Sequence, residues 1–325
     1  MFDFHETVVV VSGLTRKKKM EVLGERKYQV EEQIGEDGGV KLTVDHFPAR
    51  GITHLLSRMF QIESPIKTLK STKATKENKF FTNEGLELTP MERGSFVDRE
   101  YTRVINNFQE TYPHVAKLVS WEECLAHITS PKNGISPYTT AIVARFIQKK
   151  LFPLQCQLPV ATHFTHHTTS QPRQNRRSTK NKASRYTRSH PYHTQHTFAT
   201  KVDLLCLDLT LGELVLIEIK TGYDNGYKKF RGRIPPALSV IPGIMNTDFH
   251  QHILQTFLSW FMTLQTFPSS ALKMRAELWK IETTGTLLTF QVDTPTLKNH
   301  VSVILGTMIN SDKEIKKLAL ALQDS

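Results

Sequence analysis

Three ionisable residues, Asp203, Glu218 and Lys220, interrupt two otherwise apolar segments of the chain. These segments, residues 202–209 and 214–219, consist mostly of Val, Leu and Ile, which is typical of strands buried on both faces. Since alternate residues of a strand share a face, Glu218 and Lys220 should point the same way. Buried charges are costly unless they pair, bind a metal ion or do chemistry, so the three residues are candidates for a reactive site.

A short turn would join the two segments into a hairpin, and its position decides which charged residues meet. A turn at residues 210–211 places Asp203 directly opposite Glu218. A turn at residues 211–212 places Asp203 opposite Lys220 instead. Both alternatives bring one lysine and two carboxylates close together.

An Asp and a Glu on adjacent strands supply hard oxygen ligands for Mg²⁺ or Mn²⁺, to which Ile219 could add its backbone carbonyl. Such an ion would lower the pKa of a bound water and offset charge on a phosphorane-like transition state. Lys220 could orient or deprotonate the attacking water, or stabilise the developing charge. The alternative is a buried salt bridge between Lys220 and Glu218, which would leave Asp203 unpaired.

Hydrophobic periodicity predicts helices and strands on both sides of this hairpin. Strands are expected at residues 7–12, 28–34, 40–44, 154–161, 275–282 and 286–292. Helices are expected at residues 52–60, 91–108, 115–128, 137–151, 249–267 and from about residue 296 or later. Residues 63–83 and 235–243 should form loops.

The predicted helix at residues 91–108 carries two carboxylates beside its apolar stripe, Asp98 and Glu100. On spacing alone, both are most simply surface charges that stabilise the helix N-terminus. Gly94, near the start of this helix, would allow another part of the backbone to approach closely.

The chain of 325 residues carries a formal net charge of +11 that is unevenly distributed. Between Glu123 and Asp203 there is no Asp or Glu, whereas this stretch holds twelve Lys and Arg. A localised basic block indicates a polyanionic partner, most often nucleic acid, although a solvated basic loop has the same composition.

Residues 163–197 form the most polar part of this block, with six His, seven Arg or Lys and few apolar residues. Such a segment cannot bury enough surface to fold alone. We therefore expect a basic disordered insertion between two strands that contacts nucleic-acid backbone. The histidines are loosely spaced and no cysteine accompanies them, so they do not predict a zinc site.

Three widely spaced cysteines suggest a reducing compartment and give neither a disulfide framework nor a zinc-ligand pair. No apolar run approaches the length of a membrane span, and acidic residues at the start argue against a secretory signal. We expect an intracellular protein with no membrane partner, nuclear or mitochondrial if eukaryotic, with the nucleus favoured. The basic run at residues 16–19 is either a nuclear-import signal or a solvated turn.

The pattern D-x14-E-x-K, formed by Asp203, Glu218 and Lys220, resembles the signature of the PD-(D/E)XK nuclease superfamily. The flanking sequences TKVDLLCLD and LVLIEIKTG look like its RecB-type and lambda-exonuclease-type branch. This resemblance implies an α/β (α+β) fold with a restriction-endonuclease-like core, in which helices flank a central mixed β-sheet. It covers roughly residues 91–267, so we expect a nuclease core at residues 86–325 with the basic insertion at 163–197. The strands predicted before it indicate an N-terminal β-rich extension at residues 1–85, which the resemblance does not cover.

Other positions resemble the same branch. Gly94 and Asp98 match a first-helix motif in which a glycine precedes a His or Glu metal ligand by four residues. Gln157 falls where some members place a glutamate on the first core strand. Gln251 and Gln255 both match a helix glutamine that contacts the site or the DNA, although the tyrosine usually found four residues beyond it is absent.

The resemblance implies a Mg²⁺- or Mn²⁺-dependent deoxyribonuclease, an exonuclease that acts on DNA in replication, recombination or repair without a small-molecule cofactor. Its implied catalytic residues are Asp203, Glu218 and Lys220. Its implied metal ligands are Asp98, Asp203, Glu218 and Ile219. The resemblance implies DNA contacts from Gln251 and Gln255. Phosphate contacts are also expected from four basic residues that follow the hairpin, Lys228, Lys229, Arg231 and Arg233.

Two alternatives stay open at this point. One is a structure-specific endonuclease, and the other is a catalytically inactive DNA-binding protein of the same fold. A single-strand-binding protein or a recombinase is a further expected partner of a protein acting in these processes.

Overall fold

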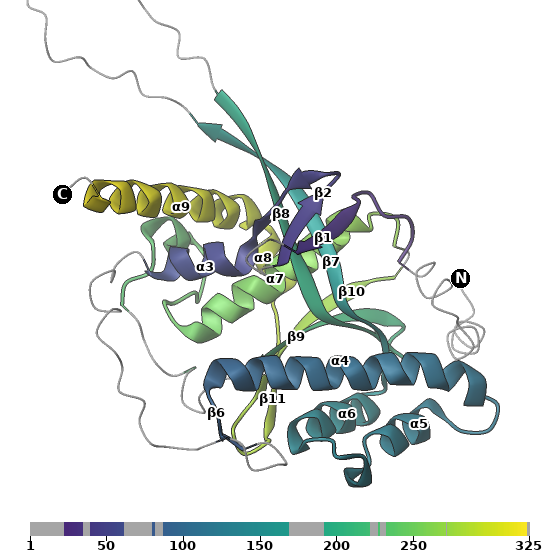
Figure 1. Ribbon diagram of the computed structural model, residues 1–325. Coiled ribbons are helices and arrows are strands. Elements are labelled where there is room, and N and C mark those ends of the chain that lie inside the picture. Colours follow the sequence, from purple (N-terminus) through teal and green to yellow (C-terminus); the bar gives the residue numbers. More distant parts are fainter. Residues whose placement is uncertain are drawn as a thin grey trace, which may run out of the picture.

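The computed structural model describes residues 23–34, 40–61, 80–81, 87–168, 192–221, 227, 232–270 and 272–323. Within these ranges a mixed central sheet is flanked by helices (Figure 1). This arrangement confirms the predicted mixed sheet with flanking helices. No helix in the described ranges is both long and apolar enough to cross a membrane.

Six strands form the central sheet: β4 (Arg50–Gly51), β7 (Leu151–Thr168), β8 (Tyr192–Asp208), β9 (Glu213–Thr221), β10 (Met274–Ile281) and β11 (Leu287–Gln291). Five of them follow the order β11-β10-β9-β8-β4, and β7 pairs with β8. The β7–β8, β8–β9 and β10–β11 pairs are antiparallel, whereas β9–β10 and β4–β8 are parallel. Strand β8 is therefore the shared member, since β7, β9 and β4 all pair with it.

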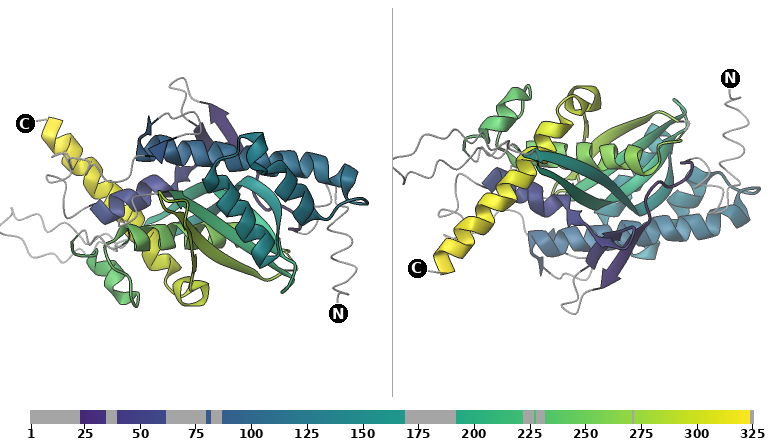
Figure 2. Two further views of the ribbon diagram at one scale, coloured as in Figure 1. Left: turned by 90° about the horizontal axis from the view of Figure 1, so that it is seen from below. Right: turned by 90° about the horizontal axis from the view of Figure 1, so that it is seen from above.

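The flanking helices are α3 (Ile52–Gln61), α4 (Pro90–Val115), α5 (Trp121–Ile128), α6 (Pro137–Lys149), α7 (Asp248–Thr266), α8 (Thr294–Lys298) and α9 (Val301–Gln323). The described ranges also contain two short 3-10 helices, η1 (Pro131–Asn133) and η3 (Pro236–Val240). Figure 1 shows α4, α5 and α6 grouped on one side of the sheet and α3, α7 and α9 on the other. Seen from above, α9 crosses the outer part of β7 and β8 (Figure 2).

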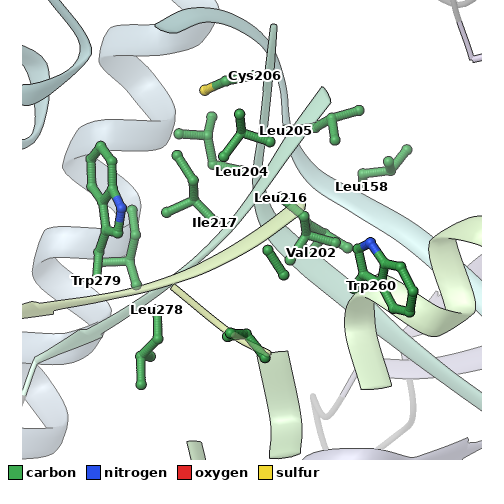
Figure 3. Packing of buried hydrophobic residues seen from close by; sticks show 14 of the residues in the cluster. Leu158, Val202, Leu204, Leu205, Cys206, Leu216, Ile217, Trp260, Leu278 and Trp279 are labelled. Carbon is green, nitrogen blue, oxygen red and sulfur yellow. The ribbon is translucent and has the colours of Figure 1, made fainter. Parts of the chain in front are cut away.

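One large hydrophobic cluster joins the sheet to the helices on both sides. Figure 3 shows its centre, where Ile217 of β9, Trp279 of β10 and Trp260 of α7 lie among aliphatic side chains. Residues of β9 from Leu214 to Ile219 are all buried. Burial on both faces explains why this strand reads as a continuous apolar run rather than an alternating one.

A second, three-stranded sheet contains β1 (Val30–Ile34), β2 (Val40–Val44) and β3 (Phe47–Pro48). The antiparallel β1–β2 pair confirms the two strands predicted there. A short pair, β5 (Phe80–Phe81) with β6 (Glu87–Leu88), precedes α4. The strand predicted at residues 7–12 lies outside the described residues. From the same N-terminal part, β4 pairs with β8 and α3 joins the main hydrophobic cluster.

Residues 115–128 do not form one helix as predicted. Helix α4 continues to Val115, and α5 begins at Trp121. The Ser120 side chain accepts a hydrogen bond from the backbone N–H of Glu123, whose side chain accepts one from the backbone N–H of Ser120. This capping box sets the start of α5, so the preceding residues form the turn between the two helices.

Strand pairing extends into the range predicted as a disordered insertion. The β7–β8 ladder continues to the pair Thr168 and Tyr192, so residues 163–168 and 192–197 are strands. Inter-strand hydrogen bonds and the crossing helix α9 supply stabilisation that the polar composition does not reveal. The remaining residues of the predicted insertion, 169–191, lie outside the described residues.

Candidate active site

Strands β8 and β9 pair in the first of the two registers expected for the hairpin. Their ladder aligns Leu204 with Ile217, so the next residues along, Asp203 and Glu218, lie opposite each other. Asp208 lies at the far end of β8, beside the turn, where it accepts a 2.6 Å hydrogen bond from an arginine of β10. Only Asp203 of the two β8 aspartates therefore lies beside Glu218.

Glu218 is the most deeply buried ionisable residue of this group, with 1% of its surface exposed. The Nζ atom of Lys220 lies 2.5 Å from its Oε1 atom, and Gln255 of α7 donates to the same oxygen at 2.6 Å. Within the described part of the chain, the second oxygen, Oε2, is buried and has no hydrogen-bond partner. An unpartnered buried carboxylate oxygen is costly, so this atom is a candidate ligand atom.

Asp203 is held in place by the backbone of the neighbouring strand. Its Oδ2 atom accepts a 2.8 Å hydrogen bond from the N–H group of Ile219. Burial raises the pKa of Asp203 well above its usual value, and the charge of Glu218 raises it further. Lys220 and the Ile219 hydrogen bond act in the opposite direction without cancelling these effects. The ionised form of Asp203 is therefore disfavoured unless further positive charge is present.

Lys220 is held in its charged form. Burial lowers the pKa of its ammonium group, but the charges of Glu218 and Asp203 outweigh that effect, so the pKa is raised above its ordinary value. In this environment Lys220 is a proton donor and a positive charge rather than a base. It suits the orientation of water or the stabilisation of developing negative charge.

Helix α4 brings a third carboxylate to the same place. Asp98 accepts hydrogen bonds at its Oδ1 atom from the Tyr101 hydroxyl at 2.7 Å and from the Gln157 amide at 2.8 Å. Gln157, on β7, has a φ of 51°, in the left-handed region that non-glycine residues seldom occupy. Its flanking residues pair with Leu204 and Val202, so Gln157 lies opposite Asp203. Strained backbone of this kind often accompanies functional sites.

Close approach of α4 to β9 explains the glycine near the start of this helix. A Cβ atom added at Gly94 would lie 3.1 Å from the Oγ1 atom of Thr221, which is tighter than ordinary contact. Helix α4 begins with a capping box formed by Thr89 and Glu92, which fixes its first turn. The cap and the glycine together place Asp98 beside the end of β9.

These side chains surround a pocket of about 300 Å³ between α4 and the β8–β9 hairpin. Its lining residues are Gly94, Val97, Asp98, Tyr101, Asp203, Ile219, Lys220 and Thr221. The hydrogen-bonded pair of Glu218 and Gln255 lies behind Lys220, on the side of α7. The pocket is therefore open to a ligand in front of Lys220 and closed by packed side chains behind it.

The donor set fits a hard divalent cation of the Mg²⁺ type. No group of three or more His, Cys, Asp or Glu side chains in the described ranges is close enough to enclose a metal ion alone. Mg²⁺ seldom needs such a group, because it keeps several waters and uses one or two carboxylates with substrate phosphates. The raised pKa of Asp203 and the unpartnered oxygen of Glu218 are the features that a cation here would relieve.

Of the predicted DNA-binding residues in the described ranges, Gln255 contacts the candidate site, and Gln251 and Arg233 do not form a hydrogen bond to its carboxylates. Gln255 contacts Glu218, whereas Gln251 is buried one turn earlier on α7. Arg233 is exposed, and its carbonyl oxygen accepts a 2.9 Å hydrogen bond from Asn246. Three predicted DNA-binding residues lie outside the described residues: Lys228, Lys229 and Arg231.

Glu100 is not the surface charge that its spacing predicted. It is buried, with 7% of its surface exposed, and its carboxylate accepts hydrogen bonds from the backbone and hydroxyl of Ser136. It therefore ties α4 to the start of α6. Asp98, predicted on spacing alone as a surface charge, is half-buried and lines the pocket.

Tyr101, on the apolar stripe of the helix predicted at residues 91–108, is the main site residue that the sequence pattern did not single out. Its ring is buried, with 1% exposed, but its hydroxyl donates to Asp98. Burial raises the pKa of Tyr101, and the charges of Asp203 and Asp98 raise it further, so the hydroxyl stays a donor. The spacing of Asp98 and Tyr101, three residues apart on one helix, was the available signal.

Comparison with known proteins adds no relative to this description. No protein-family model matches the sequence, and no curated protein is significantly similar to it. The assignment of a function therefore depends on the chemistry of the site itself.

Proposed function

We propose that this protein is a metal-dependent deoxyribonuclease, an exonuclease that hydrolyses phosphodiester bonds of DNA during replication, recombination or repair. The observation that carries the proposal is the pocket lined by Asp98, Asp203 and Lys220, with the buried Glu218 carboxylate paired to Lys220 beside it. Carboxylates clustered beside a lysine are suited to a divalent cation and a phosphate group.

A plain salt bridge accounts for only part of this cluster. Lys220 and Glu218 do form an ion pair, as the structural alternative requires. That pair leaves Asp203 with a raised pKa and Glu218 with an unpartnered oxygen among the described residues. In a purely structural ion pair, the further carboxylates of Asp203 and Asp98 add repulsion among the acidic groups that a single lysine does not offset.

In the proposed site, Asp203 and Glu218 would hold Mg²⁺ or Mn²⁺, with the carbonyl of Ile219 and the carboxylate of Asp98 completing the shell. The ion would supply a water of lowered pKa and offset charge on the phosphate. Lys220, whose pKa the two carboxylates raise in the metal-free protein, would orient that water or stabilise negative charge. Gln255 would position Glu218 through its 2.6 Å hydrogen bond.

The order of elements also supports a restriction-endonuclease-like core. Helix α4 precedes the β7–β8–β9 strands, and α7 follows them, so both helices border the hairpin that carries the charged residues. The resemblance of Asp203, Glu218 and Lys220 to the PD-(D/E)XK signature implies the same arrangement. We propose this core as the finer description of the fold.

Digestion of end-labelled linear DNA with Mg²⁺ tests the proposed function. Lys220→Ala and Asp203→Ala should each lower the rate about 100-fold or more, as expected when a charge-stabilising group is lost. Lys117→Ala, which removes an exposed lysine from the turn after α4, is the matched control and should leave the rate unchanged. Full activity of both site variants would show that the assignment is wrong.

Substrate form separates the alternatives. An exonuclease should degrade linear DNA and leave closed circular DNA intact, whereas an endonuclease should cut both. DNA binding without cleavage under Mg²⁺ or Mn²⁺ would identify a catalytically inactive binding protein instead.

A further inference from the structure

A second pocket, of about 660 Å³, lies beside the candidate active site and shares Asp98 with it, and its lining residue Gln157 donates a hydrogen bond to that carboxylate. Its lining residues are Asp98, Arg99, Thr102, Arg103, Asn106, Asn107, Glu110, Gln157 and Lys201. All except Gln157 and Lys201 belong to one face of α4. We call this hollow the α4 groove. It extends the site pocket along the helix, away from Lys220.

The lining of the α4 groove is cationic and amide-rich near the site. Arg99 and Arg103, one turn apart on α4, are both exposed, as is Asn106. The Nε atom of Arg99 donates to the Ser95 carbonyl at 3.2 Å, which orients its guanidinium along the helix. Within the described ranges Arg103 has no hydrogen-bond or ion-pair partner. The planar guanidinium of arginine and the amide of asparagine can donate hydrogen bonds to phosphate oxygens.

A cation on the neighbouring strand faces the same groove. Lys201 of β8 lines the groove and lies 2.7 Å from the carboxylate of Glu32, which is itself partly exposed. Such a partly exposed pair is weak, so the ammonium can exchange Glu32 for another anion. Lys201 is two residues from Asp203 on β8, which connects the groove to the reacting end of the hairpin.

The dimensions suit a short run of nucleic-acid backbone. From Asp98 to Asn106 the helix advances about 12 Å, at about 1.5 Å per residue. Consecutive phosphates of one strand are farther apart than their axial rise of about 3.4 Å, so the groove spans at most about three of them.

The groove lacks the features that would hold bases. Among the described lining residues of both pockets the only aromatic ring is that of Tyr101, and 1% of that residue is exposed. Proteins that hold single strands by their bases use exposed aromatic side chains as stacking surfaces. A groove lined by Arg, Lys and Asn without such rings binds backbone and does not select sequence.

We propose that the α4 groove holds up to about three consecutive phosphates of the substrate strand next to the phosphate in the active site. This inference rests on the proposed nuclease function. Arg99, Arg103 and Lys201 contact the phosphates, and Asn106 adds amide donors. Glu110, at the outer end of the groove, limits how far the strand is bound.

Binding measured without cleavage tests the groove separately from the chemistry. Fluorescence anisotropy of a labelled 12-residue DNA strand without divalent cation would give Kd for the wild type and for an Arg99→Ala/Arg103→Ala variant. The variant should bind at least about 10-fold more weakly, because each lost phosphate contact removes counterion release. The plot of log K against log salt should become less steep, its negative slope shrinking in magnitude by about 1.4 for two lost contacts with a single strand.

A matched variant controls for net charge. Lys117→Ala/Lys298→Ala also removes two exposed positive charges, but both positions lie outside the groove. Its affinity and salt slope should stay close to those of the wild type. Equal weakening by both double variants would overturn the proposal, because it would attribute binding to overall charge rather than to the groove.

Glu110→Gln gives a gain of binding that misfolding cannot imitate. Removing this negative charge from the outer end of the groove should tighten binding about 2-fold and steepen the salt slope. Unchanged or weaker binding by this variant would contradict the assigned path.

Cleavage kinetics separate failure of the groove from failure of the proposed function. If Lys220→Ala abolishes cleavage while Arg99→Ala/Arg103→Ala leaves binding and KM unchanged, the nuclease assignment stands and the groove proposal is wrong. If the wild-type protein does not cleave DNA but Arg99→Ala/Arg103→Ala weakens DNA binding as above, the groove proposal stands and the nuclease assignment is wrong. The expected result is a raised KM with kcat nearly unchanged.

Discussion

At the scale of single residues, Asp203 lowers the stability of the folded protein when it is ionised, and that ionised form is the one proposed to bind a metal ion. Burial and the charge of Glu218 raise its pKa, so its ionised form is disfavoured in the folded protein. A group with a raised folded-state pKa contributes stability at low pH and loses that contribution as pH rises through the folded value. A metal ion binds the ionised carboxylate. In the metal-free protein, that ionised form lowers the stability of the fold.

Asp203→Asn should stabilise the metal-free protein and abolish cleavage. The amide oxygen can still accept the Ile219 hydrogen bond, while the repulsion from Glu218 disappears. The free energy of unfolding at pH 7 should increase, because the amide mimics the protonated form that the raised pKa of Asp203 favours. The gain should shrink toward zero near pH 4, below which wild-type Asp203 is protonated in both states. Urea unfolding across this pH range measures it, and a loss of stability at pH 7 would contradict it.

At the scale of elements, the position of α4 against β9 decides whether Asp98 reaches the site. Gly94 allows this approach, since a Cβ atom there would meet the Thr221 hydroxyl at 3.1 Å. The helix anchors itself elsewhere through its capping box and through the contact of buried Glu100 with Ser136. Because α4 is fixed at its start and at Glu100, a shift of the helix at Gly94 also moves Asp98 relative to the pocket.

Gly94→Ala should lower activity more than it lowers stability. Alanine favours helix by about 1 kcal/mol over glycine, which offsets the tight contact with Thr221. Displacement of α4 by a few tenths of an ångström should still reduce kcat/KM about 10-fold, because a misplacement of about 1 Å can cost about 100-fold. Steady-state kinetics and thermal unfolding would measure both effects.

A double variant checks the cause of the Gly94 effect. Thr221→Ala removes the hydroxyl that the new methyl group would meet, so Gly94→Ala/Thr221→Ala should recover activity relative to Gly94→Ala. If the two substitutions simply add, the contact between α4 and β9 does not explain the loss.

At the scale of the whole molecule, Asp312 links the C-terminal helix to the N-terminal part of the chain. Its side chain, 4% exposed, pairs with Arg58 of α3, with Lys316 at 2.9 Å, and more loosely with Arg50 of β4 at 3.7 Å. Burial raises the pKa of Asp312, but these cations outweigh it and lower the pKa below its usual value. The pairs therefore stabilise the packing of α9 on α3 wherever Asp312 is ionised.

Asp312→Asn should destabilise the protein by about 1 kcal/mol at pH 7, because it removes the charge that pairs with the partly exposed Arg58 and Lys316. A depressed folded-state pKa contributes stability above the unfolded value that is lost as pH falls. The wild type should therefore lose this advantage as pH falls below about 4. Glu314→Gln, at an exposed position of the same helix, is the control and should have little effect. A constant difference between Asp312→Asn and the wild type down to pH 2 would exclude this explanation.

The sequence determined the parts of the site that depend on local patterning. Apolar runs predicted β8 and β9, and strand parity placed Glu218 and Lys220 on one face, where they are in contact. The predicted hairpin allowed two registers, because its turn could form at either of two overlapping positions. Paired hydrogen bonds along β8 and β9 selected the one that sets Asp203 opposite Glu218.

Only tertiary packing decided the rest of the candidate site. Gln251 and Gln255 lie one turn apart on the same side of α7, so helical spacing does not distinguish them. The packing of α7 against the sheet places Gln255 within hydrogen-bond distance of Glu218. Asp98 and Glu100 both looked like surface charges, but contacts from Gln157 and Ser136, remote in sequence, bury them in different ways. Periodicity shows which face of an element turns inward, whereas the partner that it meets there depends on how distant segments pack.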